Sequence, residues 1–152
     1  MAESDRPRMV GMNHVALEVG DVDEAIAWYG AIFELDLRGR SDSMAFLDLG
    51  DQFIALAESE NATETRDDHR HVGLVVDDRV AVQERLEELG IELMETGGVD
   101  IQDPWGNRLQ IVDYDAVQFT KAEHVLAGMG LTDLEKNDAA IEELAEKGMA
   151  PE

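Results

Sequence analysis

The sequence predicts an α+β fold of two paired βαβββ modules that form a cupped mixed sheet, with a C-terminal extension of two helices. Two observations predict it. The same strand pattern occurs twice, as HVALEV from His14 and as HVGLVV from His71, and a helical pattern and further strands follow each copy. Each module, residues 9–58 and 69–116, is too small to bury a core well alone, so pairing the two explains the duplication.

The first module reads as a strand, a helix, a turn at the segment DLRGR and then two or three strands. Residues 13–19 alternate between apolar side chains and other types, and this period of two predicts a strand with one apolar face. The segment GDVDEAIAWYGAIF has apolar residues at helical spacing, with Asp21 or Asp23 as the N-cap. The segments SMAFLDLG and QFIALAE predict two strands that meet at a turn of Gly50 and Asp51.

The second module repeats this order after the polar linker SENATETRDDH. HVGLVVDD predicts a strand, and RVAVQERLEELG predicts a helix with Gly90 just past its end. IELMETGG predicts a further strand and a glycine turn. GVDIQDPWGNRLQIVDY predicts a hairpin whose turn is the Pro-Trp-Gly-Asn segment at 104–107.

The tail, residues 117–152, predicts two short helices. TKAE at Thr120–Glu123 and TDLE at Thr132–Glu135 each fit a capping box, and DAAIEELAEKG is a helical pattern that ends at Gly148. These helices are expected to cover a sheet edge or a partner subunit. His124 is expected to be a solvated surface residue.

The composition excludes several classes of function. Asp and Glu number 35 against 12 Lys and Arg, a net charge of −23, so the basic footprint that nucleic acid needs is missing. The acidic residues indicate either a surface for basic partners or, as we favour, adaptation to a salty cytoplasm. The absence of cysteine excludes disulfides and thiolate chemistry. No apolar run is long enough for a membrane span, so a soluble cytoplasmic protein is expected.

Three motifs resemble the vicinal oxygen chelate superfamily, which includes glyoxalase I, extradiol dioxygenases, and fosfomycin- and bleomycin-resistance proteins. The motifs are HVALEVGDVDEAIAWY from His14, HVGLVV from His71 and DPWGNRLQIVD from Asp103. They occur in the family's order, and the resemblance covers about residues 10–115. It implies paired βαβββ modules around a cup that receives a small molecule, and a homodimer. Because this fold hosts several reactions and some plain binders, the resemblance is more specific for fold than for chemistry.

The resemblance also implies a metal site with an altered ligand set. The family's first-strand ligands correspond to His14 and His71. The final-strand ligand of module two is usually glutamate and corresponds to Gln110 here. The final-strand ligand of module one corresponds to Ala55. Two imidazoles and an amide leave a dication's charge uncompensated, so Zn, Mn, Ni or Fe would bind with modest affinity. His69 is an alternative ligand, because residues two apart on a strand share a face.

Glu18 is the carboxylate on the His14 face of the first strand, and we nominate it as the catalytic residue. Four strand residues place it ~13 Å from His14, outside one metal sphere. The residues expected to line the substrate pocket are Phe53, Ala55, Trp105, Arg108 and Tyr114.

Three hypotheses of function remain open. The chain is a metal-dependent lyase, isomerase or dioxygenase that uses His14, His71 and Gln110; or a metal-free binder that sequesters its ligand, similar to bleomycin-resistance proteins; or a structural or regulatory dimer that uses its tail. Bound metal, ligand stabilisation without metal and the effect of deleting the tail discriminate among them.

Overall fold

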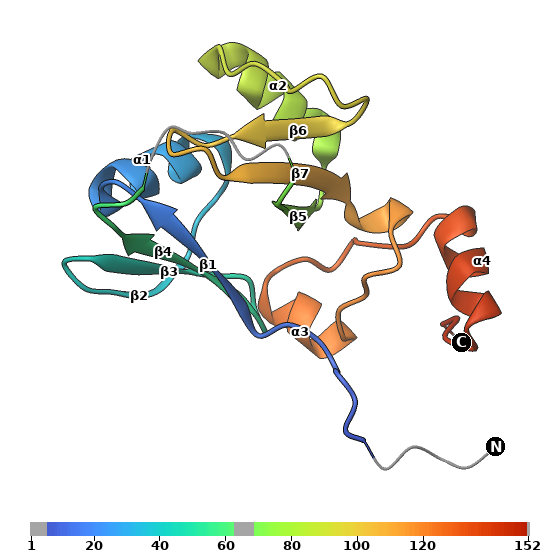
Figure 1. The fold of residues 1–152 in the computed structure, drawn as a ribbon. Coiled ribbons are helices and arrows are strands. Elements are labelled where there is room, and N and C mark those ends of the chain that lie inside the picture. Colours follow the sequence, from blue (N-terminus) through green and yellow to red (C-terminus); the bar gives the residue numbers. More distant parts are fainter. Residues whose placement is uncertain (1–5, 63–68, 152) are drawn as a thin grey trace.

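The computed structural model describes residues 6–62 and 69–151. Two mixed sheets, each accompanied by a helix, are followed by a helical tail (Figure 1). The first module comprises β1 (His14–Val19), α1 (Val22–Ile32), β2 (Leu37–Arg40), β3 (Met44–Asp48) and β4 (Phe53–Glu58). The second comprises β5 (His71–Val76), α2 (Arg79–Leu89), β6 (Val99–Gln102) and β7 (Arg108–Asp113). The tail comprises a short 3-10 turn, η1 (Tyr114–Ala116), and helices α3 (Glu123–Gly128) and α4 (Asp138–Glu146).

The first module has the predicted strand, helix and hairpin in the predicted order, but the segment predicted as a turn forms strand β2 instead, because it pairs with β3. Its strands are ordered β1-β4-β3-β2, with β1 parallel to β4 and the other pairs antiparallel. Asp21 is the N-cap of α1, and its Oδ1 accepts a hydrogen bond from the Glu24 amide at 2.8 Å. The β3–β4 turn at Gly50, where φ is 91°, is confirmed.

The second module forms a three-stranded sheet in the order β5-β7-β6, with β5 parallel to β7. Asp78 caps α2 by accepting a hydrogen bond from the Ala81 amide at 3.0 Å. Gly90 ends the helix in the left-handed conformation, as predicted. The predicted hairpin is also present, because β6 and β7 flank the Pro-Trp-Gly-Asn turn.

The strand predicted within residues 91–98 is wrong, and this segment contains no strand. The Met94 amide donates one hydrogen bond to the Asp100 carbonyl oxygen at 2.8 Å, beside β6. The Thr96 hydroxyl then donates to the Asp100 carboxylate at 2.9 Å. The segment therefore turns over Asp100 instead of continuing alongside β6, and the second sheet has one strand fewer than the first.

One hydrophobic cluster draws on both modules. It includes side chains from α1 and α2 and from the helix-facing sides of both sheets. Its most deeply buried large members are Tyr29, Leu56, Leu86, Ile101, Leu109 and Ile111. The alternation of buried Leu109 and Ile111 with half-buried Gln110 confirms the face assignment that the strand period predicts for β7.

Asp103, at the β6–β7 turn, connects the modules through a buried carboxylate. Its Oδ2 accepts hydrogen bonds from the Tyr29 hydroxyl at 2.8 Å and from the Asn107 side-chain amide at 2.7 Å. Its Oδ1 accepts from the backbone amides of Trp105 at 3.0 Å and Asn107 at 2.9 Å. Asn107 Nδ2 also donates to the backbone oxygen of Glu18 at 2.9 Å. One acidic side chain thus organises the turn and joins it to α1.

Trp105 of the same turn packs over Gly20, between β1 and α1. A Cβ atom at Gly20 would lie 2.5 Å from the indole Nε1, so this close approach requires a residue without a side chain. Trp105 is half-buried and packs against the shared core.

We expect Tyr29→Phe to remove part of the loss of stability at alkaline pH. Burial, and then the negative charge and hydrogen bond of Asp103, raise the pKa of Tyr29 well above its usual value of 10.0. A raised folded-state pKa contributes stability that is fully present below pH 10 and is lost above it, at about 1.4 kcal/mol per pH unit, as the unfolded chain ionises. The measurement is urea unfolding from pH 8 to 11. Tyr114→Phe is the control, and an unchanged slope in Tyr29→Phe would contradict the prediction.

Two helices in the tail are confirmed, but their caps are not the predicted ones. Helix α3 begins after Ala122 without a side-chain cap, and the Thr120 hydroxyl donates to the Gln118 carbonyl oxygen instead. No helix begins at Thr132. Helix α4 is capped by Asn137, whose Oδ1 accepts from the Ala140 amide at 2.8 Å.

Lys136 connects the segment around η1 to the segment before α4 through hydrogen bonds to backbone oxygens. Its ammonium group donates to the carbonyl oxygens of Tyr114 at 2.5 Å and Val117 at 2.7 Å, and also to that of Phe119. It lies 3.7 Å from the centre of the Tyr114 ring. Burial lowers the pKa of Lys136 from its usual value. In the part of the chain that the structure describes, no helix is long and apolar enough to cross a membrane.

Candidate functional site

Each sheet buries one face against the core and leaves the other, which we call its open face. In the first sheet the register pairs His14 with Phe53 and Glu18 with Ala57, so these side chains share the open face with Ala55. His14 and Glu18 are exposed, Phe53 is half-buried and Ala55 is buried. The first predicted ligand, the nominated carboxylate and two predicted pocket residues therefore lie on one surface.

His14 stacks on Phe53, with ring centres 4.7 Å apart and an interplanar angle of 8°. Its Nδ1 is 2.8 Å from the side-chain oxygen of Asn13. Because that oxygen can only accept, Nδ1 is the donor of this hydrogen bond, and in the neutral imidazole the lone pair is then on Nε2. His14 is therefore oriented as a base or a ligand through Nε2.

The open face of the second sheet carries the other predicted ligands. Strand β5 pairs with β7 so that His71 lies opposite Arg108 and Gly73 lies opposite Gln110. His71, Arg108 and Gln110 therefore share this face. His71 is exposed, and the other two side chains are half-buried.

His71 has the same arrangement as His14. Its Nδ1 is 2.9 Å from the backbone oxygen of His69, an acceptor only, so the proton again lies on Nδ1 and the lone pair on Nε2. His69, the alternative ligand, thus contributes its carbonyl oxygen to the orientation of His71.

The two histidines lie in different sheets, and no strand pairing connects these sheets. Within residues 6–62 and 69–151, no group of three or more His, Asp or Glu side chains is placed to hold a metal ion. The structure thus brings His71 together with Gln110, and His14 together with Phe53, on two separate faces.

The other predicted pocket residues are engaged in internal contacts. Arg108 donates through Nε and Nη2 to Oδ2 of Asp100, at 2.9 and 2.8 Å, and the Asp100 side chain is fully buried. Tyr114 is buried, and its ring contacts Phe119 and Lys136 of the tail.

Gln102, opposite Arg108 in the register, is a polar residue that the sequence did not single out. Its Nε2 is buried without a hydrogen-bond partner in the described part of the chain. Such a donor is costly unless something else satisfies it.

Arg38 is a second residue that sequence reasoning missed. A β-bulge lies between Leu37 and Gly39 on β2, because these two residues pair with Leu47 and Phe46, which are consecutive on β3. The guanidinium of Arg38 lies 4.9 Å from the centre of the Phe53 ring, on the open face. The signal in the sequence was Gly39, since an isolated glycine in a strand pattern suggests a bulge.

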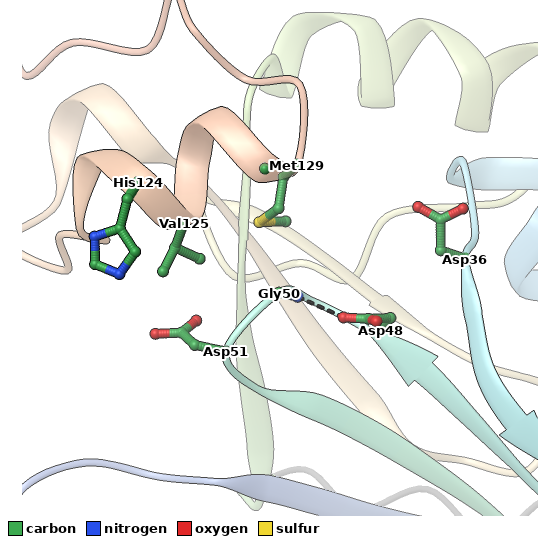
Figure 2. Close-up of a pocket in the computed structure, with 8 residues that line it drawn as sticks. Asp36, Asp48, Gly50, Asp51, His124, Val125 and Met129 are labelled. Carbon is green, nitrogen blue, oxygen red and sulfur yellow. Dashed lines mark hydrogen bonds between the residues drawn. The ribbon is translucent and has the colours of Figure 1, made fainter.

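A cavity of about 410 Å³ lies between α3 and the β3–β4 turn, away from the predicted ligands. Figure 2 shows Asp51 and Gly50 of the turn opposite His124, Val125 and Met129 of the tail, while the Asp48 carboxylate accepts a hydrogen bond from the Gly50 amide. The hydrogen bond from Lys121 lowers the pKa of Asp51. His124 is exposed, as expected. Lys121 pairs with Asp51, and Val125 and Met129 lie against Gly50, so the tail contacts the first sheet at this turn.

These features define a duplicated α+β protein in which each repeat presents an oriented histidine at the start of its first strand. The model of the Glyoxalase/Bleomycin resistance protein/Dioxygenase superfamily matches residues 11–111. The chain belongs to this superfamily, as the three sequence motifs predicted.

Solved structures share the fold at low sequence identity. A lactoylglutathione lyase from Agrobacterium tumefaciens is 22% identical over 71% of this chain and 96% of its own, with a TM-score of 0.55. The fosfomycin resistance protein FosX from Listeria monocytogenes is 19% identical over 70% of this chain and 93% of its own, with a TM-score of 0.59. FosX has also been solved with Mn(II) and a sulfate ion, and that structure covers 68% of this chain and 92% of its own, at 19% identity and a TM-score of 0.57.

Proposed function

We propose that the protein binds a small molecule between the open face of its first sheet and the open face of the second sheet of a partner chain, with a divalent metal ion held by His14 of one chain and by His71 and Gln110 of the other. The observation that carries this proposal is the shared state of the histidines. Each places its Nδ1 proton on an oxygen acceptor and leaves the Nε2 lone pair free. This is how metal-binding histidines are usually oriented by their second hydrogen bond. The residues present therefore fit a divalent metal.

The metal would supply Lewis-acid chemistry, polarising a carbonyl or oxyanion of the bound molecule. The relative solved with Mn(II) supports a divalent ion of this kind. Glu18 lies on the His14 face and is exposed, so it is the residue that we propose to move a proton. Gln102 Nε2, an unsatisfied donor, lies on the His71 face, where a ligand would give it a partner.

A metal-free binder is the second candidate. It is favoured by the stacking of His14 on Phe53, which makes the imidazole part of an aromatic surface, and by the missing carboxylates at Gln110 and Ala55. A protein of this type would be stabilised by its ligand in the absence of metal.

We also propose a homodimer in which the His14 face of one chain meets the His71 face of its partner. A two-fold axis makes two such sites at once. The segment before β1 supports a partner, because Met9 and Val10 are almost fully exposed there, at 101% and 99%. The acidic surplus supports our proposal of a salt-adapted protein of the cytoplasm, since dense carboxylates hold water at high salt.

We expect the purified protein to bind about one divalent ion per chain, and a His14→Ala, His71→Ala double variant to bind none. The measurement is elemental analysis together with titration of Zn, Mn, Ni and Fe(II). His124→Ala is the matched control, because this exposed histidine lies in the tail and should leave metal uptake unchanged. Equally negligible uptake by the wild type and the double variant would contradict the metal site and favour the metal-free binder.

A further inference from the structure

The bulge in β2 places a positive charge on a face where the strand period alone would not place one. Arg38 and Arg40 are two residues apart and would share a face of a regular strand. Arg40 pairs with Ala45, which is buried in the core, and its Nη1 bonds Asp23 of α1 at 2.9 Å. Arg38 is instead turned to the opposite side, over Phe53. Bulges commonly redirect a side chain in this way beside functional sites.

Among the residues that the structure describes, none accepts a hydrogen bond from Arg38. In the described residues it forms no ion pair with a carboxylate, although the chain carries 35 acidic residues and 12 basic ones. Its guanidinium lies against the face of the Phe53 ring, so within residues 6–62 and 69–151 the N–H groups at its edge have no hydrogen-bond acceptor. That edge matches the paired oxygens of a carboxylate, phosphate or phosphonate.

Arg38 and His14 both contact Phe53. The guanidinium lies 4.9 Å and the imidazole centre 4.7 Å from the centre of its ring. Phe46 adds an edge-on contact with the same ring at 5.6 Å. The open face of the first sheet therefore combines an aromatic floor, an oriented imidazole and a cation that pairs with no described carboxylate.

We propose that Arg38 anchors the anionic group of the ligand, so that the site takes small molecules that carry a carboxylate, phosphate or phosphonate next to an apolar or aromatic body. This inference rests on the proposed function, because it assigns the substrate class of that same face. The guanidinium holds the anionic group, and Phe53 packs against the apolar body. The anion then lies within reach of the face that carries His14.

The test uses phenylphosphonate and benzoate as anionic probes and benzyl alcohol as their neutral counterpart. Binding to the full-length, chelator-treated protein is measured by NMR titration of the His14 and Phe53 ring signals, so that no metal ion can hold the anion. We expect Arg38→Gln to weaken both anionic probes about tenfold or more, the scale of a hydrogen bond to a charged group, and to leave benzyl alcohol unchanged. Arg38→Lys should recover only part of the affinity, because an ammonium lacks the planar fork.

Arg40→Gln is the matched control, since this arginine lies on the same strand but faces α1. It should bind all three probes as the wild type does. Equal weakening of charged and neutral probes by Arg38→Gln, or no weakening, would overturn the anion anchor and leave the small-molecule site standing. If no probe shifts the His14 and Phe53 signals in the wild type, both the anchor and the site are overturned. Metal uptake by Arg38→Gln should equal that of the wild type.

Discussion

Mixing His14→Ala chains with His71→Ala chains should restore metal binding that neither variant has alone. In a two-fold dimer with sites between chains, a mixed dimer has one site that lacks both histidines and one that is intact. Random exchange makes half of the dimers mixed, so about a quarter of the wild-type sites should return. This expectation follows from the placement of the histidines on strands of two separate sheets.

The measurement is metal content after the two variants are unfolded together and refolded, with each variant refolded alone as the control. A wild-type sample treated in the same way gives the full value. Failure of the mixture to gain metal, while the wild type regains it, would place both histidines of a site in one chain and remove the proposed arrangement of faces.

Asp103→Ala should be the most destabilising single substitution that we describe. Four hydrogen bonds converge on this carboxylate, which is 4% exposed, and they come from Tyr29, Trp105 and Asn107. An alanine leaves these donors without their acceptor and opens a gap beneath the turn. Because each unsatisfied buried group costs about 1–3 kcal/mol, we expect a loss of about 3 kcal/mol or more.

The loss is measured as the change in the free energy of unfolding in urea. Asp115→Ala is a suitable control, because it removes an exposed acid just after β7. A change below 1 kcal/mol for Asp103→Ala, which is about the worth of one ordinary hydrogen bond, would show that the turn does not depend on this carboxylate.

The sequence predicted those elements whose pattern is local. The cap at Asp21, the helix end at Gly90 and the turn around Trp105 were predicted because a single residue type satisfies the backbone there. The strand period also separated Gln110 from its buried neighbours on β7. These features need no knowledge of the rest of the chain.

The wrong predictions concern segments in which a nearby polar group takes a hydrogen bond that the predicted element does not include. Residues 91–98 have strand-like side chains, but the hydrogen bonds of Met94 and Thr96 to Asp100 draw the segment into a turn. Thr120 fits a capping box, but its hydroxyl bonds Gln118. In both cases a hydrogen bond to a residue two to six positions away competes successfully with the predicted pattern.

The candidate site was predictable in its histidines but not in its arrangement. The repeated motif identified His14 and His71, whereas their assignment to two sheets depends on the pairing of whole strands. Arg38 was missed because its segment was predicted as a turn, and in the strand that forms there a one-residue bulge also reverses the face that a regular spacing would give. An alternation of period two does not reveal a bulge, although Gly39 is a residue type that often marks one.

The indole of Trp105 belongs to the second repeat but lies on Gly20 of the first. The chain has only one other tryptophan, at Trp28. Any separation of the halves would expose the Trp105 ring to water, so fluorescence emission of a Trp28→Phe protein would give an optical signal of whether the halves stay joined. The fluorescence of Trp105 therefore reports whether the two repeats are packed against each other.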